Sequence, residues 1–309
     1  MRRTEGATWT EMIAGFAIIA VFGATILPYA IARAMNEPPT CQNNLKQWGL
    51  VFKMFANESR GSYYPQLANH EPYGGEALAF FPAGGQLYPE YVADLSITAC
   101  PGRAGVEEIA EEYWQCPDGR WCDGGAIEPA KIGWDLDHYF YLSRPISDDA
   151  GYVAVRTLLS QAGNDGAFGK SMEVLRGGGG LEFQPSLPDN LIQEISEVLE
   201  SAGVPENERP NLDDHTVWTG GFELREGIER FFITDINNPA AGAVAQSSIA
   251  IMWDTLPGIP YGEPGADAAF PHEGRGAYAL FMDGHVELRP FPQPGFPISR
   301  LHAAVDGVL

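Results

Sequence analysis

The sequence predicts an α+β protein with a long N-terminal helix that spans a membrane and a globular head built on an antiparallel β-sheet. Three stretches support this prediction. The 21 residues 12–32 carry no charged side chain, and a helix of that length extends about 30 Å, the thickness of a hydrocarbon core. Residues 41–57 place apolar side chains, Leu50 and Met54 among them, at helical spacing on a broad face. Near the C-terminus, residues 277–289 alternate around Asp283-Gly284, a pair that favours the two-residue reversed turn of a β-hairpin.

The residues that flank the apolar run indicate orientation and function. Arg2 and Arg3 precede it, and positive charge favours the cytoplasmic side of a membrane. Glu11 stands at the entrance of the run, where burying a carboxylate costs a few kcal/mol. Because charged residues are rare in membrane segments and usually have a function there, Glu11 is predicted to be functional. No small-residue cleavage site follows the run, so ordinary signal-peptidase cleavage is not expected.

Four residues around this run resemble the processing and assembly site of the type IV pilin and pseudopilin family. Gly6 ends a short leader, and counting from Ala7 makes Glu11 the fifth residue and Pro28 the twenty-second. The resemblance implies that a prepilin peptidase cuts after Gly6 and that the new N-terminus, Ala7, is methylated. It also implies that Glu11 and Pro28 act in filament assembly.

The resemblance divides the chain into four parts. They are the leader at 1–6, a membrane or filament-core helix at 7–35, the second part of that helix at 36–60, and a head at 61–309 that contains the hairpin 277–289. Two prolines at 38 and 39 interrupt the helix, and Thr40 can cap its continuation.

Two further motifs resemble a large-headed subgroup of the same family. The run from Cys41 to Gln47 reads Cys-Gln-Asn-Asn-Leu-Lys-Gln, like the C-x-N-N-L-K-Q run of that subgroup. Near the C-terminus, His272 precedes Asp283-Gly284 as in its H-x9-D-G motif, although ten residues intervene here. The resemblance therefore extends to both ends of the chain and leaves the middle third unassigned.

Composition predicts a loop-rich, acidic head. The chain of 309 residues has a net charge of −22, 19% charged residues, 36 glycines and 24 prolines. So many turn residues argue against a helical bundle. So negative a surface repels nucleic acid and anionic lipid headgroups, so neither is an expected partner.

The four cysteines, Cys41, Cys100, Cys116 and Cys122, are predicted to form two disulfides, since an even count outside the cytoplasm favours pairing. The turn at 117–119 brings Cys116 toward Cys122, which by elimination pairs Cys41 with Cys100. Free thiols and a zinc site are the alternatives, although the C-x5-C spacing is longer than that of a zinc knuckle.

The remaining chemistry is sparse. Asp254, Asp267 and Asp283 lie around the predicted hairpin and are candidate ligands for Ca²⁺, which prefers oxygen donors. Asp283 has the simpler role of a turn residue. The sequence contains no nucleophile elbow, zinc-protease or dinucleotide-binding motif. We therefore expect a non-enzymatic protein with no cofactor other than this possible Ca²⁺.

Other elements are read from local patterns. Residues 138–142 and 249–254 are predicted strands, and residues 187–202 are a predicted helix. Residues 153–159 fit either a strand or a helix, and residues 222–234 look strand-like.

The resemblance implies a pilin-like structural subunit that assembles into a type IV pilus or a type II secretion-like filament. Its expected partners are copies of itself, other pilins or pseudopilins, the prepilin peptidase/methyltransferase and the inner membrane. Before assembly it would be a single-pass inner-membrane protein with an extracytoplasmic head, and afterwards part of a periplasmic or cell-surface filament. The alternative is a single-pass anchored binding or enzymatic domain outside the cytoplasm that does not polymerise. The mature N-terminus distinguishes the two.

Overall fold

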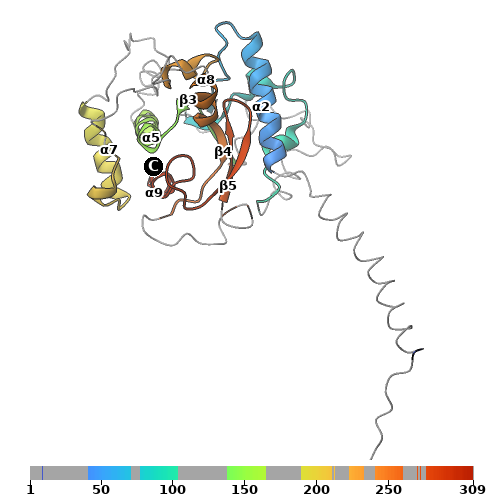
Figure 1. Ribbon diagram of the computed structural model, residues 1–309. Helices are drawn as coiled ribbons and strands as arrows, with labels where there is room; N and C mark the ends of the chain where they lie inside the picture. The colour runs from blue at the N-terminus through green and yellow to red at the C-terminus, as the bar shows by residue number, and fades with distance from the viewer. Residues whose placement is uncertain are drawn as a thin grey trace, which may run out of the picture. The chain divides into compact units, whose positions relative to one another are not determined.

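The structure is a computed structural model that describes residues 9, 41–70, 77–103, 138–164, 189–210, 212, 223–232, 241–259, 270, 272 and 276–308. The chain divides into two compact units, Met1–Thr40 and Cys41–Leu309. Apart from Trp9, the described residues all belong to the second unit. There they form a mixed α/β fold with two antiparallel sheets (Figure 1).

The larger sheet has four antiparallel strands in the order β3-β4-β5-β6. Their bounds are Tyr139–Ile146 for β3, Ala250–Asp254 for β4, Gly276–Phe281 for β5 and Val286–Pro290 for β6. The strands predicted at 138–142 and 249–254 are therefore confirmed, although β3 continues to Ile146. Every residue of β4 is buried because a hydrophobic cluster covers each face of the sheet.

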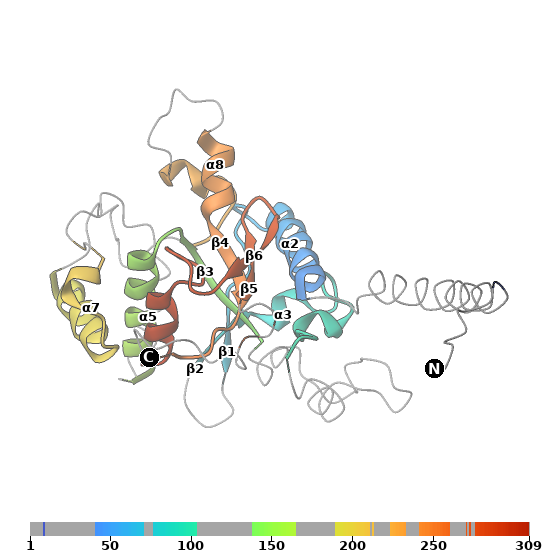
Figure 2. The same cartoon turned by 60° about the horizontal axis from the view of Figure 1, so that its bottom comes forward.

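One face of the larger sheet is covered by helix α2, Cys41–Glu58 (Figures 1 and 2). The helix predicted at 41–57 is thus confirmed. Leu45, Trp48 and Phe52 follow one another along one side of α2 and are almost completely buried, each worth about 1.5–3 kcal/mol of stability. Leu50 is 61% exposed and Met54 38% exposed, so the apolar face of this helix is narrower than predicted.

The opposite face is covered by helices α5, Asp149–Asn164, and α9, Arg300–Asp306, and α7, Asp189–Ser201, packs against α5 (Figure 2). Residues 153–159, whose sequence fits either a strand or a helix, lie in α5, and the helix predicted at 187–202 is confirmed as α7. Because side chains alternate along a strand, Tyr141 of β3 joins the α2 side while Phe140 joins the α5 side.

The smaller elements connect these layers. β1, Leu67–His70, and β2, Ala77–Pro82, form a two-stranded antiparallel sheet. Residues predicted to be strand-like at 222–234 instead contain the 3₁₀ helix η4, Ile228–Phe232. Gly227 has φ of +83°, which breaks an extended backbone just before η4. The remaining short elements are α3 (Gly84–Leu87), η1 (Leu95–Thr98), η3 (Glu206–Glu208) and α8 (Ala241–Ser248).

The predicted C-terminal hairpin exists, but its turn differs from the expected one. The last ladder pair joins Leu280 to Val286, and the Phe281 amide donates to the His285 carbonyl at 3.0 Å. A two-residue reversed turn needs positive φ at both Asp283 and Gly284, yet of these two only Gly284 has it, at +91°. The turn is therefore a three-residue loop in which glycine supplies the left-handed residue.

The predicted fold class is wrong. We expected a pilin-like α+β fold with a long membrane-spanning helix and one antiparallel sheet in the head. The described residues instead form a mixed α/β fold with two antiparallel sheets. None of the helices in the described ranges is long and apolar enough to cross a membrane. The predicted span at 12–32 lies outside those ranges.

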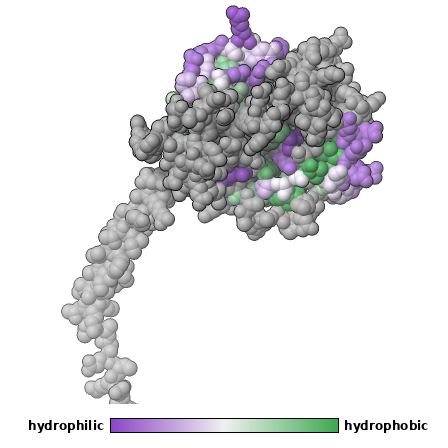
Figure 3. Space-filling view, turned by 180° about the vertical axis from the view of Figure 1, so that it is seen from behind, coloured by the Kyte–Doolittle hydropathy of each residue, from purple (hydrophilic) through white to green (hydrophobic). Residues whose placement is uncertain are grey.

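The surface of the described part is divided between hydrophilic and apolar residues. Seen from behind, hydrophilic residues gather along its outer edges, with apolar residues between them (Figure 3). In α7, Ile195 and Leu199 are buried whereas Glu197 and Glu200 are exposed. This helix is thus amphipathic, with its apolar side turned toward the core.

Candidate functional site

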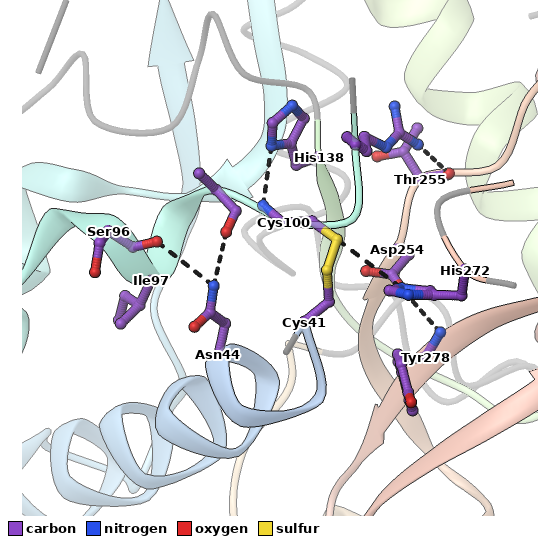
Figure 4. Close-up of a disulfide and its surroundings, with 12 residues drawn as sticks. Cys41, Asn44, Ser96, Ile97, Cys100, His138, Asp254, Thr255, His272 and Tyr278 are labelled. Atoms are coloured by element: carbon purple, nitrogen blue, oxygen red, sulfur yellow. Dashed lines mark hydrogen bonds and ion pairs between the residues drawn. A yellow bond between two sulfur atoms is a disulfide. The ribbon is translucent and has the colours of Figure 1, made fainter. Parts of the chain in front are cut away.

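A disulfide joins Cys41, the first residue of α2, to Cys100, which follows η1 (Figure 4). Both cysteines are almost completely buried, and their Cα atoms are 4.9 Å apart, within the normal range for a disulfide. This is the pair predicted by elimination. The bond ties residues 59 positions apart in the chain at the point where α2 begins.

Two side chains of α2 hold the segment that carries Cys100, independently of the disulfide. The Asn44 amide donates to the carbonyl of Ala99 at 2.7 Å, and the Trp48 indole donates to the carbonyl of Ile97 at 3.0 Å. Cys41, Asn44 and Trp48 are three and four residues apart, so all three lie on one side of the helix. Side-chain hydrogen bonds from α2 therefore fix the backbone just before Cys100.

His138, immediately before β3, supports the same cysteine from another direction. Its Nδ1 accepts a hydrogen bond from the Cys100 amide at 3.0 Å, which requires an unprotonated Nδ1. Burial, and after it the charge of Arg103, lowers the pKa of His138 to about 4. The ring is consequently neutral at physiological pH and serves as an acceptor for the backbone.

Asp254, the last residue of β4, is completely buried beside the disulfide. Its Oδ2 accepts a hydrogen bond from the Tyr278 amide at 2.6 Å and lies 2.9 Å from Nε2 of His272. Its Oδ1 is also buried and has no hydrogen-bond partner among the described residues. Leaving a carboxylate oxygen unsatisfied in the interior costs about 1–3 kcal/mol, so this atom needs an explanation.

His272 completes the cluster and directs one ring nitrogen toward two partners. Nε2 is 2.9 Å from Oδ2 of Asp254 and 3.9 Å from Sγ of Cys100 (Figure 4). A catalytic relay would place the acid on one ring nitrogen and the nucleophile on the other. Here both approach the same nitrogen, so the geometry favours a common centre of coordination over a relay.

The four candidate ligands lie close enough to share one ion. One atom each from Cys41, Cys100, Asp254 and His272 lies within 4.8 Å of the other three. The first three residues are buried, and the histidine is partly buried. Figure 4 shows that they come from α2, the segment after η1, the end of β4 and the residues before β5. We refer to these four residues as the Cys-His-Asp cluster.

The other predicted calcium ligands do not join this cluster. Asp254 ends β4, whereas the opposite end of β4, at Ala250, pairs with Phe281 two residues before Asp283. Asp254 and Asp283 therefore lie at opposite ends of the sheet and do not converge. Asp283 accepts from the His285 amide at 3.0 Å, as a turn residue does. Asp267 lies outside the described residues.

His272 and Asp283-Gly284, which together form the predicted C-terminal motif, are also separated. His272 bridges to Gly276 at the start of β5, whereas Asp283 follows its end. A strand of this length extends about 20 Å, so His272 and Asp283-Gly284 lie at opposite ends of β5 and belong to different parts of the structure. The histidine belongs to the Cys-His-Asp cluster and the Asp-Gly pair to the hairpin turn.

The remaining predicted site residues lie outside the described ranges. These are the processing residues Gly6 and Ala7, the assembly residues Glu11 and Pro28, and the second cysteine pair Cys116 and Cys122.

Sequence reasoning missed the polar residues around the disulfide. In the sequence, Asn44 stands out only as part of the C-x-N-N run, and His138 only as part of a strand. The available signal for Asn44 was its place one helical turn after Cys41. That place does not reveal which distant backbone group the side chain meets.

A second buried polar cluster lies on the opposite face of the sheet. Asp306 of α9 accepts from Arg156 Nε at 3.1 Å and from the hydroxyl of Tyr152, and lies 3.3 Å from His302 Nε2. Burial would raise the pKa of Asp306, but His302 and then Arg156 hold that pKa below its usual value. We call these four residues the Arg-Asp cluster. Its charges are mutually compensated, as a structural ion-pair network requires.

Comparison of the chain with protein-family models, with curated proteins and with solved structures finds no match.

Proposed function

We propose that this protein is a pilin-like structural subunit, cut after Gly6 by a prepilin peptidase and assembled into a filament through its N-terminal apolar segment. The spacing of Gly6, Glu11 and Pro28 supports the proposal from the sequence. The partners would be copies of this chain and other pilins or pseudopilins, and the head would lie outside the cytoplasm.

The observation that carries the proposal is the way in which the first turns of α2, beginning at Cys41, are fastened to the rest of the described fold. In a filament, any load on the head passes through the first turns of α2, because the N-terminal segment enters there. Within those turns the disulfide, Asn44 and Trp48 all hold the segment 97–100. A covalent bond and two buried hydrogen bonds make this a firm attachment. A disulfide also fits an oxidising compartment outside the cytoplasm.

The role proposed for Glu11 is electrostatic. Once residues 1–6 are removed, the amine of Ala7 in one subunit can neutralise Glu11 of a neighbour in the apolar filament core. A buried charge left unpaired costs several kcal/mol, so the pair selects the register between subunits more than it adds net stability.

The test has two readouts in cells that express the full chain with a prepilin peptidase. Mass spectrometry is expected to find Ala7 as a methylated N-terminus, and electron microscopy to find filaments that contain the protein. Glu11→Gln should abolish filaments while the Cys41–Cys100 disulfide still forms. Glu90→Gln, a charge change on an exposed residue of the head, is the matched control. Normal filaments from the Glu11 variant would overturn the role of this residue.

The alternative is an extracytoplasmic binding domain that does not polymerise. The converging donors of the Cys-His-Asp cluster favour it, since a passive subunit has no need of them. An N-terminus that retains Met1, together with a protein that never enters filaments, would support this alternative.

A further inference from the structure

The Cys-His-Asp cluster has the donor set of a zinc site. It offers two sulfurs, one imidazole nitrogen and one carboxylate oxygen, all within 4.8 Å of one another. Zn²⁺ prefers four ligands of these types in a tetrahedron, whereas Ca²⁺ and Mg²⁺ prefer oxygen alone. Thiolates therefore decide against the calcium that the sequence suggested and in favour of a softer ion.

Asp254 supplies an independent observation that points to a ligand. This carboxylate is completely buried, and its Oδ1 has no hydrogen-bond partner in the described part of the chain. Its other oxygen is already used by Tyr278 and His272. A metal ion bound by this carboxylate would compensate a charge that is otherwise buried with one oxygen unpartnered.

The two sulfurs should stay close after the disulfide is broken. Asn44 and Trp48 hold the backbone of residues 97–99, and His138 holds the amide of Cys100, without any help from the disulfide. Around zinc, two thiolates need to separate only to about 3.8 Å, given Zn–S distances of about 2.3 Å. Small side-chain rotations can provide that movement while the backbone remains fixed.

The charges are suited to the ion. Two thiolates, one carboxylate and a neutral histidine leave the site with one net negative charge after Zn²⁺ binds. The guanidinium of Arg103 donates to the carbonyl of Thr255, the residue after Asp254, and so places a positive charge beside the site. The ensemble is close to neutral, which a mostly buried site requires.

From these observations we infer that Cys41, Cys100, His272 and Asp254 form a redox-gated zinc site. When oxidised, the two sulfurs form the disulfide and cannot bind metal. When reduced, they bind Zn²⁺ together with Nε2 of His272 and a carboxylate oxygen of Asp254. The site does not depend on the proposed function, because it lies wholly within the head and needs no second subunit.

The chemistry balances with an external dithiol as reductant. The dithiol delivers two electrons and two protons, so that the S–S bond breaks, two S–H groups form and the dithiol becomes a disulfide. Zn²⁺ then displaces both thiol protons to the solvent as it binds. Re-oxidation by a disulfide oxidant reverses the electron transfer and releases the ion.

The test uses the full chain in the Cys116→Ser/Cys122→Ser background, so that every thiolate signal comes from Cys41 and Cys100. The protein is reduced with a water-soluble phosphine, which becomes the phosphine oxide by taking oxygen from water and does not compete as a thiol. Titration with Co²⁺, the spectroscopic substitute for zinc, is expected to give thiolate charge-transfer bands and intense visible bands typical of a tetrahedral site. One ion per chain should bind, and Zn²⁺ should displace it. The oxidised protein should show no such bands.

Variants identify the ligands. His272→Asn and Asp254→Asn should each weaken zinc binding by about tenfold or more, measured by competition with a chromophoric chelator. Asp283→Asn, on the hairpin turn at the other end of the sheet, is the matched control and should bind as the parent does. Circular dichroism checks that each variant is folded.

X-ray absorption on the parent protein loaded with zinc keeps the test valid if a variant fails to fold. It should find two sulfur and two nitrogen or oxygen neighbours. The proposal is overturned if the reduced protein shows no tetrahedral cobalt spectrum, or if zinc is bound by two sulfurs without His272 and Asp254.

Discussion

The face of the larger sheet under α2 and the face under α5 and α9 both contain buried polar side chains, but they stabilise them differently. Under α2, a disulfide and hydrogen bonds hold the Cys-His-Asp cluster, and Oδ1 of Asp254 is left without a hydrogen-bond partner among the described residues. Under α5 and α9, the charges of Arg156 and Asp306 are paired, and Nε2 of His302, which also has no hydrogen-bond partner among the described residues, lies 3.3 Å from Oδ2 of Asp306. The contrast suggests that the first cluster is built to bind something and the second to hold the fold.

The largest effect is expected on the α5 side. Arg156→Met removes the guanidinium that pairs with the buried Asp306 and should lower the free energy of unfolding by about 3–5 kcal/mol in urea denaturation. Lys53→Met is the matched control. Lys53 pairs with Glu226 at 2.7 Å, but the two side chains are 32% and 28% exposed, so the loss should be below about 1 kcal/mol. Equal losses in the two variants would remove the contrast between buried and exposed pairs.

The next effect belongs to the α2 side. Replacing Cys41 and Cys100 together by alanine removes a cross-link between residues 59 positions apart, which should cost about 2–4 kcal/mol because the unfolded chain gains freedom. Chemical denaturation in the presence of a chelator measures it. If the two faces are stabilised independently, the double-cysteine variant and Arg156→Met should lose stability additively.

Lowering the pH should reduce the stability of the protein first on the α2 side of the sheet, through His138. Its pKa in the folded protein is about 4, lowered from 6.5, so the unfolded chain binds more protons between these values. Stability is therefore full above pH 6.5 and is lost as the pH falls toward 4. Full conversion of the shift gives about 3 kcal/mol, and we expect about 2 because solvent screens part of it.

The control for this pH effect is His138→Asn, whose oxygen can accept the Cys100 amide but does not titrate. Its unfolding free energy should be nearly flat over the same interval, with the oxidised protein kept in chelator. Asp306, whose pKa is held below its usual value, contributes stability that is lost only at lower pH, below about 4. A parent protein without pH dependence between 6.5 and 4 would contradict the role of His138.

The smallest effect tests two neighbouring asparagines. Asn44→Ala leaves the carbonyl of Ala99 without its 2.7 Å hydrogen bond and should cost about 1–2 kcal/mol. Asn43 is exposed on the same helix, so Asn43→Ala should change the unfolding free energy by less than about 0.5 kcal/mol. Thermal unfolding of both variants measures the difference, and equal shifts would show that Asn44 does not hold the segment before Cys100.

Short sequence patterns were enough to predict α2, β4 and the position of the C-terminal hairpin. The apolar periodicity of residues 41–57 and the short apolar run at 249–254 identified α2 and β4, because burial of one helix face or of a whole strand is visible within a few residues. The hairpin was located by Asp283-Gly284, but its loop was misjudged because the φ angle of Asp283 depends on the register of β5 and β6.

The candidate site could not be predicted in the same way. Asp254 meets His272 only because β4 pairs with β5 in a particular register and residue 272 bridges back to Gly276. Cys41, Cys100 and Asp254 are separated by long stretches of chain, and their spacing in the sequence does not predict that they lie together in the fold. Donor types were visible in the sequence, whereas their convergence is a property of the fold.

Within the described residues, the β6 edge of the larger sheet has a consequence for the behaviour of this protein at high local concentration. β6 is the last strand in the order β3-β4-β5-β6, and no other described strand pairs with it. Glu287 and Arg289 form an ion pair at 3.1 Å on this strand, and Pro290 ends it. Charges and a proline discourage another chain from adding a strand there. Crowded heads can thus lie beside one another without fusing into a continuous, irreversible β-aggregate.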